Sequence, residues 1–422
     1  LSADLLPMLQ SGFRPGHSTE TAVLQVLSEL LQAVDRGEVG ALILLDLTAA
    51  FDTVDHDILL QRLQQTFGID GNVHRWFRSY LVGRTQYVRR GALRSLITRL
   101  LCGVPQGSVL GPLLFILYTF DLIQLIEGHG LGPHLYADDT QVSGSCHPSN
   151  VSAFSSSISD CLRDVASWMK SNRLQLNSSK TEVMWCATSR RQHLLPASAL
   201  SVDGVTVDPV MSIRDLGIYI DADLSMRTHV QRTVSCCFAV LRQLRQIRRL
   251  VPPATFQTLV VALVLSRLDY SNGVLVGLPT YLVRRLQSVL NASARMIFQL
   301  RRSDHITDAL ASLHWLRVPE RMQFKIAVLT YKVLHGTAPR YLGPLVRVSD
   351  LPGRRRLRSA STDRLVVPPF KLSTIGGRTF NVAAARTWNG LPEDVTSSPT
   401  LPAFRKRLKT HLFRQSYPDI VP

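Results

Sequence analysis

Three aspartates in the first third of the chain have the surroundings expected of a site that does chemistry. Asp138 and Asp139 stand side by side between two short apolar runs, with Gly132 before them and Gly144 after. This pattern is typical of a tight β-hairpin, so we expect both carboxylates near its tip. Aspartate is common in turns because it accepts local backbone hydrogen bonds, so the pair alone does not establish a site.

The third carboxylate, Asp46, directly follows an apolar run at residues 41–45 that predicts a strand buried on both faces. A carboxylate there is costly unless it is compensated, by a helix N-terminus, a salt bridge or a bound cation. Three carboxylates from two strand ends meet the ligand needs of two Mg²⁺ ions in phosphoryl transfer. We therefore predict that Asp46 and Asp138 bridge the metals and that Asp139 supports them.

Charge is distributed unevenly along the 422 residues. The chain holds 48 Lys and Arg against 31 Asp and Glu, a net charge of +17. Residues 1–222 hold 17 basic and 21 acidic residues, residues 223–340 hold 17 and 5, and residues 341–422 hold 14 and 5. The acidic front suits cation binding, and the strongly basic back suits a polyanion such as nucleic acid.

Cysteine usage and hydropathy indicate the compartment. The six cysteines form no Cys-x-x-Cys pair and no zinc-type cluster with histidine, which favours free thiols in a reducing environment. No signal peptide is evident, and the apolar run at residues 259–265 is too short to cross a bilayer. We expect a protein of the nucleus or cytoplasm without a membrane partner. The chain begins at Leu1 inside what resembles a continuing segment, so we also expect a fragment.

Periodicity places these residues in a mixed α+β front and a helical back. Helices are expected between residues 19 and 36 and at 58–67, 72–82, 113–126, 151–169, 228–249, 254–268, 279–300 and 320–335. Asp52, Asp55 and Asp57 are most simply helix caps or solvated turn residues. Residues 346–422 are rich in Pro, Ser and Arg, including a basic run at 354–358, and predict a loosely packed segment.

Two groups of arginines are candidates for contact with nucleic acid. Arg242, Arg245, Arg248 and Arg249 fall at three- and four-residue spacing along one helix, with almost no acid nearby. Such a stripe can be only a solvated face, but its repetition in later helices favours contact with a nucleic-acid backbone. A second group alternates through an expected hairpin at residues 85–102, where a solvated edge and phosphate contact are equally compatible with the pattern.

The aspartates belong to a longer series of motifs. The series comprises residues 45–52, 103–112, 136–139 and 176–181, with residues 12–16 ahead of it and residues 215–221 and 388–392 behind it. In order and spacing it resembles the reverse transcriptase of LINE-type non-LTR retrotransposons: motif A, motif B, the Y-x-D-D box and motif D, preceded by a block of the fingers and followed by elements of the thumb and tail.

The resemblance implies an α+β fold with a right-hand polymerase palm, which is an antiparallel sheet with helices, and partial fingers over residues 1–222. An all-helical thumb is implied at 223–345, and a basic C-terminal segment at 346–422. The implied activity is RNA-directed DNA polymerase, with RNA template, DNA primer and dNTPs as partners. Two Mg²⁺ ions are implied, for which Mn²⁺ can substitute.

The resemblance also assigns roles to single residues. Phe51 is implied to be a steric gate against the 2′-OH of ribonucleotides. Gln106, with Gly107 and Tyr136, is implied to contact the incoming nucleotide or the template base. Lys180 is implied to protonate the leaving pyrophosphate, although a solvent-facing lysine in a turn is the simpler interpretation.

Departures from the family pattern leave alternatives open. The finger segment whose basic residues grip the triphosphate, the endonuclease and a terminal zinc knuckle are not visible in this sequence. A catalytically inactive remnant that only binds nucleic acid is therefore the main alternative. An RNA-dependent RNA polymerase is a third hypothesis, which Phe51 disfavours.

Overall fold

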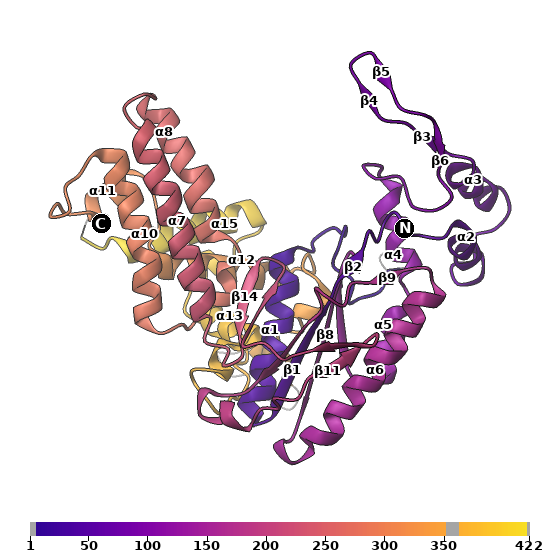
Figure 1. Ribbon diagram of the computed structural model, residues 1–422. Helices are drawn as coiled ribbons and strands as arrows, with labels where there is room; N and C mark the ends of the chain where they lie inside the picture. Colours follow the sequence, from indigo (N-terminus) through magenta and orange to yellow (C-terminus); the bar gives the residue numbers. More distant parts are fainter. Residues whose placement is uncertain (1–5, 352–362, 420–422) are drawn as a thin grey trace. The chain divides into compact units, whose positions relative to one another are not determined.

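Two structural units make up the computed structural model, which describes residues 6–351 and 363–419 (Figure 1). The sheet unit contains the described residues up to Ser18, together with Val39–Trp185 and Leu194–Val210. The helical unit contains Thr19–Glu38, Cys186–His193 and the described residues from Met211 onward.

The apolar run before Asp46 forms a central strand of the sheet unit. The four-stranded sheet has the order β10-β1-β8-β7, with the pairs β1–β8 and β7–β8 antiparallel. Its strands are β1 (Val39–Leu45), β7 (Gly132–Tyr136), β8 (Asp139–Cys146) and β10 (Glu182–Cys186). Leu45 pairs with Thr140 at the end of the β1–β8 ladder. One further step of this register brings Asp46 opposite Asp139.

Helices α5 (Leu122–Gly128) and α6 (Val151–Ser171) pack against this sheet (Figure 1). α2 (His56–Gln65) packs against α3 (Gly71–Leu81) and α4 (Leu110–Tyr118). α6 shows why they form: Ile158, Leu162, Val165 and Met169 recur at helical spacing and are all buried. At α2, the Asp55 side chain accepts hydrogen bonds from two backbone N–H groups of the first turn, as expected of an N-cap.

Residues 110–128 are, among the described residues, long and apolar enough to cross a membrane by composition. In the structure they form α4 and α5 in place of the single helix expected at residues 113–126. Leu114, Phe115 and Leu117 are buried in the core of the sheet unit. Burial in this core accounts for the apolar composition of the stretch.

Short paired strands complete the sheet unit. They are β2 (Leu47–Thr48) with β9 (Gln175–Leu176), β3 (Thr85–Gln86) with β6 (Thr98–Arg99), β4 (Arg89–Arg90) with β5 (Leu93–Arg94), and β11 (Leu200–Val202) with β12 (Val205–Val207). β3 to β6 form a two-stranded ribbon over residues 85–99 that projects beyond α3 (Figure 1). This is the hairpin expected from the sequence.

The helical unit holds one hairpin, β13 (Ser212–Asp215) with β14 (Ile218–Asp221), and most of the helices. The helices are α1 (Thr19–Arg36), α7 (Arg227–Ile247), α8 (Pro253–Val260), α9 (Ser266–Asp269), α10 (Thr280–Phe298), α11 (Thr307–Ser312), α12 (Val318–Leu334), α13 (Phe380–Asn389), α14 (Glu393–Thr396) and α15 (Leu401–Ser416). A π-helical turn at Val261–Leu265 joins α8 to α9, where one helix was expected.

The prediction of a loosely packed C-terminal segment is wrong for its described part. Trp388 of α13 and Phe404 of α15 stack with ring centroids 5.8 Å apart, and Phe404 stacks on Tyr331 of α12 at 4.5 Å. All three side chains are buried in one apolar core. The few apolar residues of this segment recur at helical spacing. The high content of Pro, Ser and Arg made this periodicity hard to recognise in the sequence. The basic run at 354–358 lies outside the described residues.

The expected boundaries at residues 222 and 345 also differ from the observed division, because α1 belongs to the helical unit. Its polar side chains bond to distant residues of that unit: Glu20 with Lys325 (2.8 Å), Ser28 Oγ with the Phe380 N–H (3.0 Å), and Asp35 Oδ1 with the Leu372 N–H (2.6 Å). Partners more than 300 residues away leave no local signal in the sequence.

Candidate active site

The predicted hairpin with carboxylates at its tip is present. Tyr136 and Asp139 form the last pair of the β7–β8 ladder, so Ala137 and Asp138 make a two-residue turn. Ala137 has φ +58°, a left-handed conformation that a residue with a Cβ adopts at a cost. The position of Asp138 therefore depends on whatever holds Ala137 in this conformation.

Gln10 holds it. The Gln10 side chain is 1% exposed, and its Oε1 accepts hydrogen bonds from the N–H groups of Ala137 (2.9 Å) and Gly12 (2.8 Å). Its Nε2 donates to the Ala137 carbonyl (3.3 Å). A Cβ on Gly12 would lie 2.3 Å from the Ala137 nitrogen, so the close approach requires glycine. Sequence reasoning missed Gln10, because a buried amide in a loop has no distinguishing pattern.

Asp46 contacts the turn that contains Lys180 through its side chain and its backbone. Asp46 Oδ2 lies 3.3 Å from Lys180 Nζ, and the Asp46 carbonyl accepts a hydrogen bond from the Asn177 N–H at 2.8 Å. The Lys180 N–H in turn donates to the Asn177 carbonyl at 3.1 Å. The Lys180 side chain remains 66% exposed, so it is both solvent-facing and directed at a predicted metal ligand.

The three carboxylates act on one another electrostatically. Burial raises the pKa of Asp138, and the negative charge of Asp46 raises it further. Burial and then the charges of Asp138 and Asp46 raise the pKa of Asp139 to about 6, while Lys180 opposes the rise. The Asp139 side chain is nevertheless accessible to solvent, so both proton exchange and ligand approach are open. The β1–β8 register and the hairpin turn thus leave the three carboxylates close enough for their charges to act on one another.

A divalent cation would relieve this repulsion, and carboxylate oxygens are the ligands that Mg²⁺ prefers. Asp46 Oδ2 is buried and, although Lys180 Nζ lies 3.3 Å away, it accepts no hydrogen bond from the described residues, so it can still accept a ligand. In the described parts of the chain, however, no three His, Cys, Asp or Glu side chains are close enough to form a ready-made metal cluster. The aspartates fit a metal in charge and ligand type, and their side chains would have to converge to hold it.

Three of the four predicted nucleotide-binding residues line one cavity of about 610 Å³. They are Phe51, Gln106 and Gly107, while Tyr136 is not among the lining residues. The Phe51 ring stacks on Phe115 with centroids 4.5 Å apart and meets the edge of Phe13 at 6.3 Å. Because aromatic rings hold Phe51 on two sides, it presents a fixed wall to the cavity.

Backbone hydrogen bonds dock the glycine-rich loop onto the residues after β2. The Gly103 N–H donates to the Val54 carbonyl (2.7 Å), and the Val104 N–H donates to the Phe51 carbonyl (2.9 Å). A Cβ on Gly103 would lie 3.0 Å from the Asp52 carbonyl oxygen, and its φ of +90° also favours glycine.

Asp52 has a role that the sequence did not reveal. Gln106 Nε2 donates to Asp52 Oδ1 at 2.7 Å, so Asp52 orients the predicted nucleotide contact. Gln106 is 54 residues further along the chain, so nothing local distinguishes this aspartate from the neighbouring caps.

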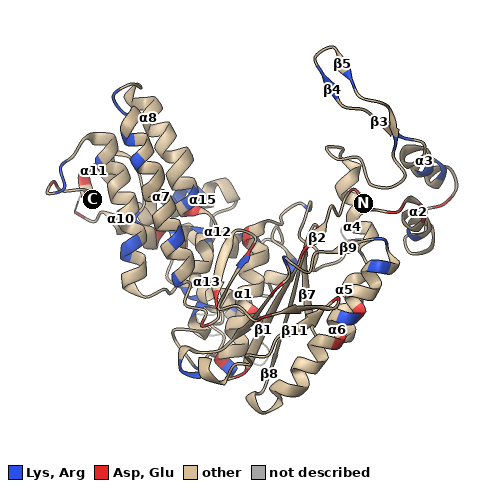
Figure 2. Ribbon diagram, viewed as in Figure 1, with Lys and Arg blue, Asp and Glu red and all other residues tan. Residues whose placement is uncertain are grey.

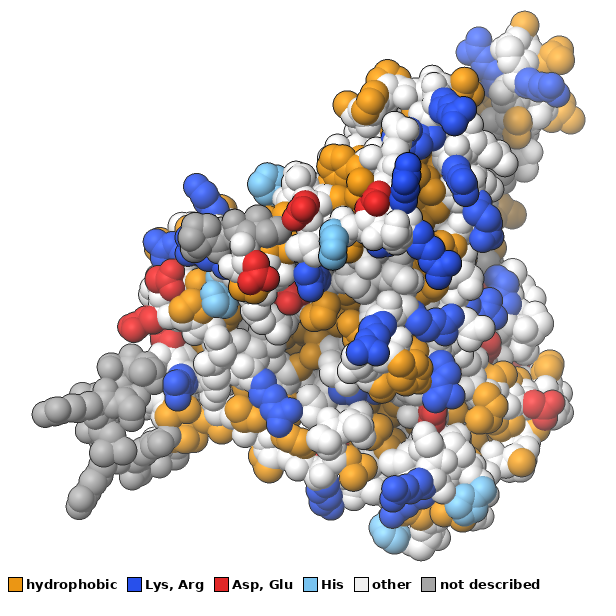
Figure 3. Space-filling view, turned by 90° about the vertical axis from the view of Figure 1, so that its left-hand side faces the viewer, with side chains coloured by type: hydrophobic (Ala, Val, Ile, Leu, Met, Phe, Trp, Pro, Cys, Tyr) orange, Lys and Arg blue, Asp and Glu red, His pale blue; other side chains and the backbone are white. Residues whose placement is uncertain are grey.

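The predicted arginine stripe is only partly available as a surface. Arg242, Arg245 and Arg249 are exposed. Arg248 is not free: its Nε donates to the Met296 carbonyl (2.6 Å), and its guanidinium also bonds the next carbonyl, at the C-terminal end of α10. Arg248 therefore has a structural role, as is common for a cation at a helix C-terminus. Figure 3 shows one face of the molecule on which Lys and Arg side chains are more widespread than Asp and Glu.

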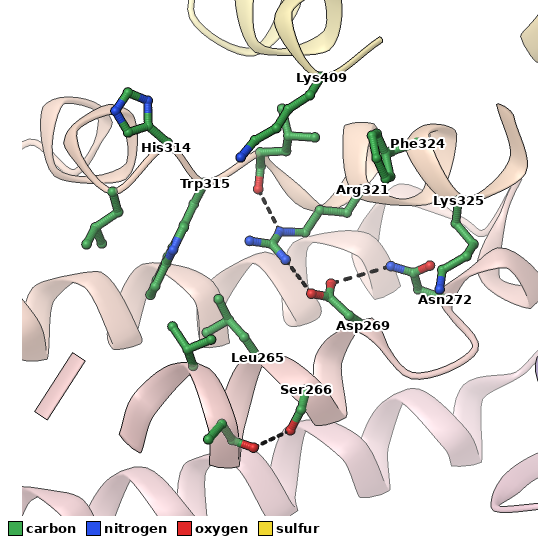
Figure 4. A pocket seen from close by; sticks show the side chains of 14 residues that line it. Leu265, Ser266, Asp269, Asn272, His314, Trp315, Arg321, Phe324, Lys325 and Lys409 are labelled. Atoms are coloured by element: carbon green, nitrogen blue, oxygen red, sulfur yellow. Dashed lines mark hydrogen bonds and ion pairs between the residues drawn. The ribbon is translucent and has the colours of Figure 1, made fainter. Parts of the chain in front are cut away.

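A separate cavity of about 700 Å³ lies within the helical unit (Figure 4). Arg321 on its wall pairs with Asp269 (2.5 Å) and donates to the Leu316 carbonyl (2.9 Å), and Lys325 pairs with Glu20 (2.8 Å). Both cations are thus already neutralised. None of the predicted site residues lines this cavity. We therefore regard it as a space left between packed helices.

Comparison with known proteins agrees with the motif series. The profile of the family described as "Reverse transcriptase (RNA-dependent DNA polymerase)" matches residues 2–220. The chain is 34% identical over 247 residues to a probable RNA-directed DNA polymerase from transposon BS of Drosophila melanogaster, covering 57% of this chain and 26% of that protein. It is 32% identical over 234 residues to the corresponding protein from the X-element of the same species, covering 54% and 24%.

Solved structures show a weaker likeness. A telomerase from Candida albicans in complex with telomeric RNA is 14% identical with a TM-score of 0.38, over 75% of this chain and 53% of that one. Apo telomerase from Candida tropicalis is 13% identical with a TM-score of 0.40, over 74% and 51%. Neither likeness is close enough to add to what the sequence match establishes.

The matched relatives are much longer than this chain, which spans about a quarter of their length. The family match covers residues 2–220, which include the three aspartates and the glycine-rich loop of the predicted palm. The expected α+β fold and the predicted resemblance to LINE-type elements are thereby confirmed. This chain belongs to the reverse transcriptase family, and the relatives reported above are polymerases of transposons.

Proposed function

We propose that this chain is the polymerase portion of a retrotransposon protein that extends a DNA 3′-OH on an RNA template. One observation supports the proposal: Asp46, Asp138 and Asp139 lie at the ends of paired strands, and the charges of Asp46 and Asp138 act on Asp139. Such a cluster suits two-metal nucleotidyl transfer better than a structural role, because nothing in the fold requires three repelling carboxylates.

In this proposal Asp46, Asp138 and Asp139 hold two Mg²⁺ ions, for which Mn²⁺ can substitute. When bound, such ions lower the pKa of the attacking hydroxyl and neutralise charge on the triphosphate and the leaving pyrophosphate. Lys180 lies 3.3 Å from Asp46 at the edge of the site and would donate a proton to the pyrophosphate oxygen.

The cavity beside Phe51 is the proposed nucleotide pocket. Its volume of about 610 Å³ is within the range of ligand pockets. The Phe51 ring, held by Phe115, would occupy the space of a ribonucleotide 2′-OH and so select dNTPs. Gln106, oriented by Asp52, would contact the base. Gly107 has φ +78° and open space at its Cβ position, so a flat ring or a backbone can approach it closely.

The proposed substrates are polyanions, and residues 223–422 carry the complementary positive charge. Arg242, Arg245 and Arg249 are exposed on and directly after α7, and we propose that they contact the phosphates of the RNA template or the DNA primer. Those substrates would be met in the nucleus or the cytoplasm.

Primer extension tests the polymerase proposal. The chain and its Asp138→Ala variant are compared on an RNA template with a DNA primer, dNTPs and Mg²⁺. We expect extension by the first and a loss of at least about 10³-fold in the second, since removing a metal ligand removes the metal-dependent stabilisation of the transition state. Anisotropy of the labelled primer–template duplex serves as the control for folding and binding.

The same assay separates the alternatives. An inactive remnant would bind the duplex with or without Asp138 and extend the primer in neither form. An RNA-dependent RNA polymerase would use rNTPs and dNTPs equally well. That result would contradict the proposed role of Phe51 as a steric gate.

A further inference from the structure

A local reversal of charge lies inside the acidic front of the chain. Residues 71–120 contain no Asp, Glu or Lys. The same residues include seven arginines: Arg75, Arg78, Arg84, Arg89, Arg90, Arg94 and Arg99. Five of them lie at residues 84–99, in the ribbon formed by β3 to β6 or directly before it. Figure 2 shows Lys and Arg along this ribbon and no Asp or Glu.

The ribbon places two like charges directly opposite each other. Arg89 of β4 pairs with Arg94 of β5 across the ladder. Like charges in such a position destabilise a sheet. Among the described residues, no carboxylate forms an ion pair with any of the five ribbon arginines. The Arg89 Nε donates to the Gly91 carbonyl at 3.0 Å, and the Arg94 guanidinium lies over the Tyr87 ring, so neither charge is neutralised by its partner. An anionic ligand bound by both side chains would offset the repulsion.

Exposed flat and aliphatic side chains lie between these arginines. Trp76 of α3 is 52% exposed and stacks on Tyr80 with centroids 5.4 Å apart, and Tyr87 of the ribbon is 47% exposed. The Arg84 guanidinium lies over the Tyr80 ring at 5.4 Å, and the Arg94 guanidinium lies over Tyr87 at 5.2 Å. The ribbon's exposed aliphatic side chains are Val88, Leu93, Leu96 and Ile97.

This combination fits one class of ligand. Arginines alone would suit any phosphate, but exposed rings and aliphatic groups need apolar faces to contact. In a nucleic-acid duplex the base faces are covered by stacking, whereas in a single strand they are accessible to aromatic side chains. Two copies of this chain that met through their ribbons would bring arginine against arginine, so charge disfavours a symmetric pair as the occupant.

We infer that α3 and the arginine ribbon, residues 71–99, bind a single-stranded stretch of the RNA template. Phosphates occupy the positions beside Arg89 and Arg94, and unstacked bases lie against Trp76 and Tyr87. Only the choice of RNA rests on the proposed function, in which the unpaired template is the single strand. The binding chemistry itself requires no polymerase activity.

Fluorescence anisotropy of the full chain with a labelled single-stranded RNA of 20 nucleotides, without dNTPs, tests this inference. The variant Arg89→Gln/Arg94→Gln removes the opposed charges. Each lost phosphate contact changes the slope of log K against log salt by about 0.7 for single strands, so we expect the slope to become about 1.4 less steep. At 0.1 M salt this corresponds to roughly 25-fold weaker binding.

The matched control is Arg163→Gln/Lys170→Gln, which removes two equally basic side chains of α6, each 69% exposed, from the same unit. We expect it to bind like the parent chain. Equal losses in both double variants would show only a dependence on net charge and would overturn the inference. Circular dichroism confirms that each variant is folded.

Two further experiments identify the ligand. Trp76→Ala should weaken binding while leaving the salt slope unchanged, because it removes stacking and no charge. Unlabelled duplex RNA should compete less well than single-stranded RNA. Equal competition by the duplex, or better competition by single-stranded DNA of the same sequence, would overturn the assignment. Failure of primer extension would leave all these results unaffected, so the two proposals fail separately.

Discussion

The side-chain amide of Gln10 bonds both backbone groups of Ala137, accepting from its N–H at 2.9 Å and donating to its carbonyl at 3.3 Å, across 127 residues of chain. Ala137 is the left-handed residue of the turn that presents Asp138 and Asp139. Gln10 is therefore a positioning residue. It contacts no reacting group, and it fixes the backbone from which two proposed metal ligands project.

Gln10→Leu should weaken both stability and metal-dependent activity. The change leaves the N–H groups of Ala137 and Gly12 buried without their acceptor, which costs about 1–3 kcal/mol for each group. We expect a lower urea midpoint and a higher Mg²⁺ concentration for half-maximal primer extension. The shift in Mg²⁺ requirement separates a positioning role from a merely structural one.

Two variants control the Gln10 experiment. Gln10→Glu keeps the accepting oxygen and should fall between the parent chain and Gln10→Leu. Gln61→Leu removes an exposed amide of α2 in the same unit and should change neither measurement. An unaltered Mg²⁺ requirement in Gln10→Leu would argue against the positioning role.

Asp139→Asn should abolish primer extension and slightly stabilise the metal-free chain. The folded-state pKa of Asp139, about 6, lies above the unfolded value of about 3.9. Its ionised form therefore reduces stability fully above pH 6, and this penalty disappears as the pH falls towards 4. Because the side chain is accessible to solvent, we expect a gain of about 1 kcal/mol or less at pH 7.5.

Thermal unfolding in EDTA measures this gain, expected as an increase in melting temperature of a few degrees at most. The difference between Asp139→Asn and the parent chain should vanish at pH 4. A variant less stable than the parent at pH 7.5 would contradict the repulsion between the three carboxylates.

Mg²⁺ affinity should fall as the pH is lowered through about 6. Protonated Asp139 cannot serve as a carboxylate ligand, so below that pH each unit should reduce the apparent affinity by about tenfold. Lys180→Met should move the midpoint to higher pH, because Lys180 opposes the rise in the Asp139 pKa. Calorimetric Mg²⁺ titrations between pH 5 and 8 measure both effects, and an affinity independent of pH would exclude Asp139 as a ligand.

Phe51→Val should relax the selection against ribonucleotides. The smaller side chain vacates the space that the Phe51 ring fills beside Phe115. Selection by shape in an apolar pocket is typically worth 10- to 200-fold, so we expect the ratio of dNTP to rNTP incorporation to fall by roughly 10- to 100-fold. Phe51→Tyr, which keeps the ring, should retain most of the selection. Unchanged selectivity in Phe51→Val would place the gate elsewhere.

Trp388→Ala should destabilise the helical unit by about 3–5 kcal/mol, since it removes a buried indole that stacks on Phe404. The indole N–H also donates to the Asp363 carbonyl at 2.8 Å. Trp388→Phe keeps the stack and loses this bond, so we expect a loss of about 1 kcal/mol. Urea unfolding measures both. Equal stability of Trp388→Ala and the parent chain would mean that the C-terminal helices contribute nothing to this core.

Local patterns in the sequence predicted most of the strands, turns and loops of the sheet unit, including those that carry the candidate site residues. The apolar strand ending at Asp46, the hairpin around Asp138, the cap at Asp55 and the glycine-rich loop each depend on residues within a few positions of one another. Periodicity and turn chemistry act over the same range, so these predictions were confirmed.

Features that depend on distant partners could not be predicted in this way. Gln10 acts on Ala137, Asp52 acts on Gln106, and Arg248 bonds the carbonyls at the end of α10 instead of lying on an open surface. The single helix expected at residues 113–126 failed for a related reason, since tertiary packing divides the apolar run into α4 and α5. In each case a contact with a distant residue decides the role, and that contact exists only in the folded chain.

Because α1 belongs to the helical unit, it cannot complete its packing until much later parts of the chain have been synthesised. Its partners Lys325, Leu372 and Phe380 leave the ribosome long after it does. At 5–20 residues per second the interval is on the order of tens of seconds. Throughout that time the polar side chains Glu20, Ser28 and Asp35 of this helix lack these late-emerging partners, and a chain that ends before residue 372 leaves its first helix without two of the three bonds.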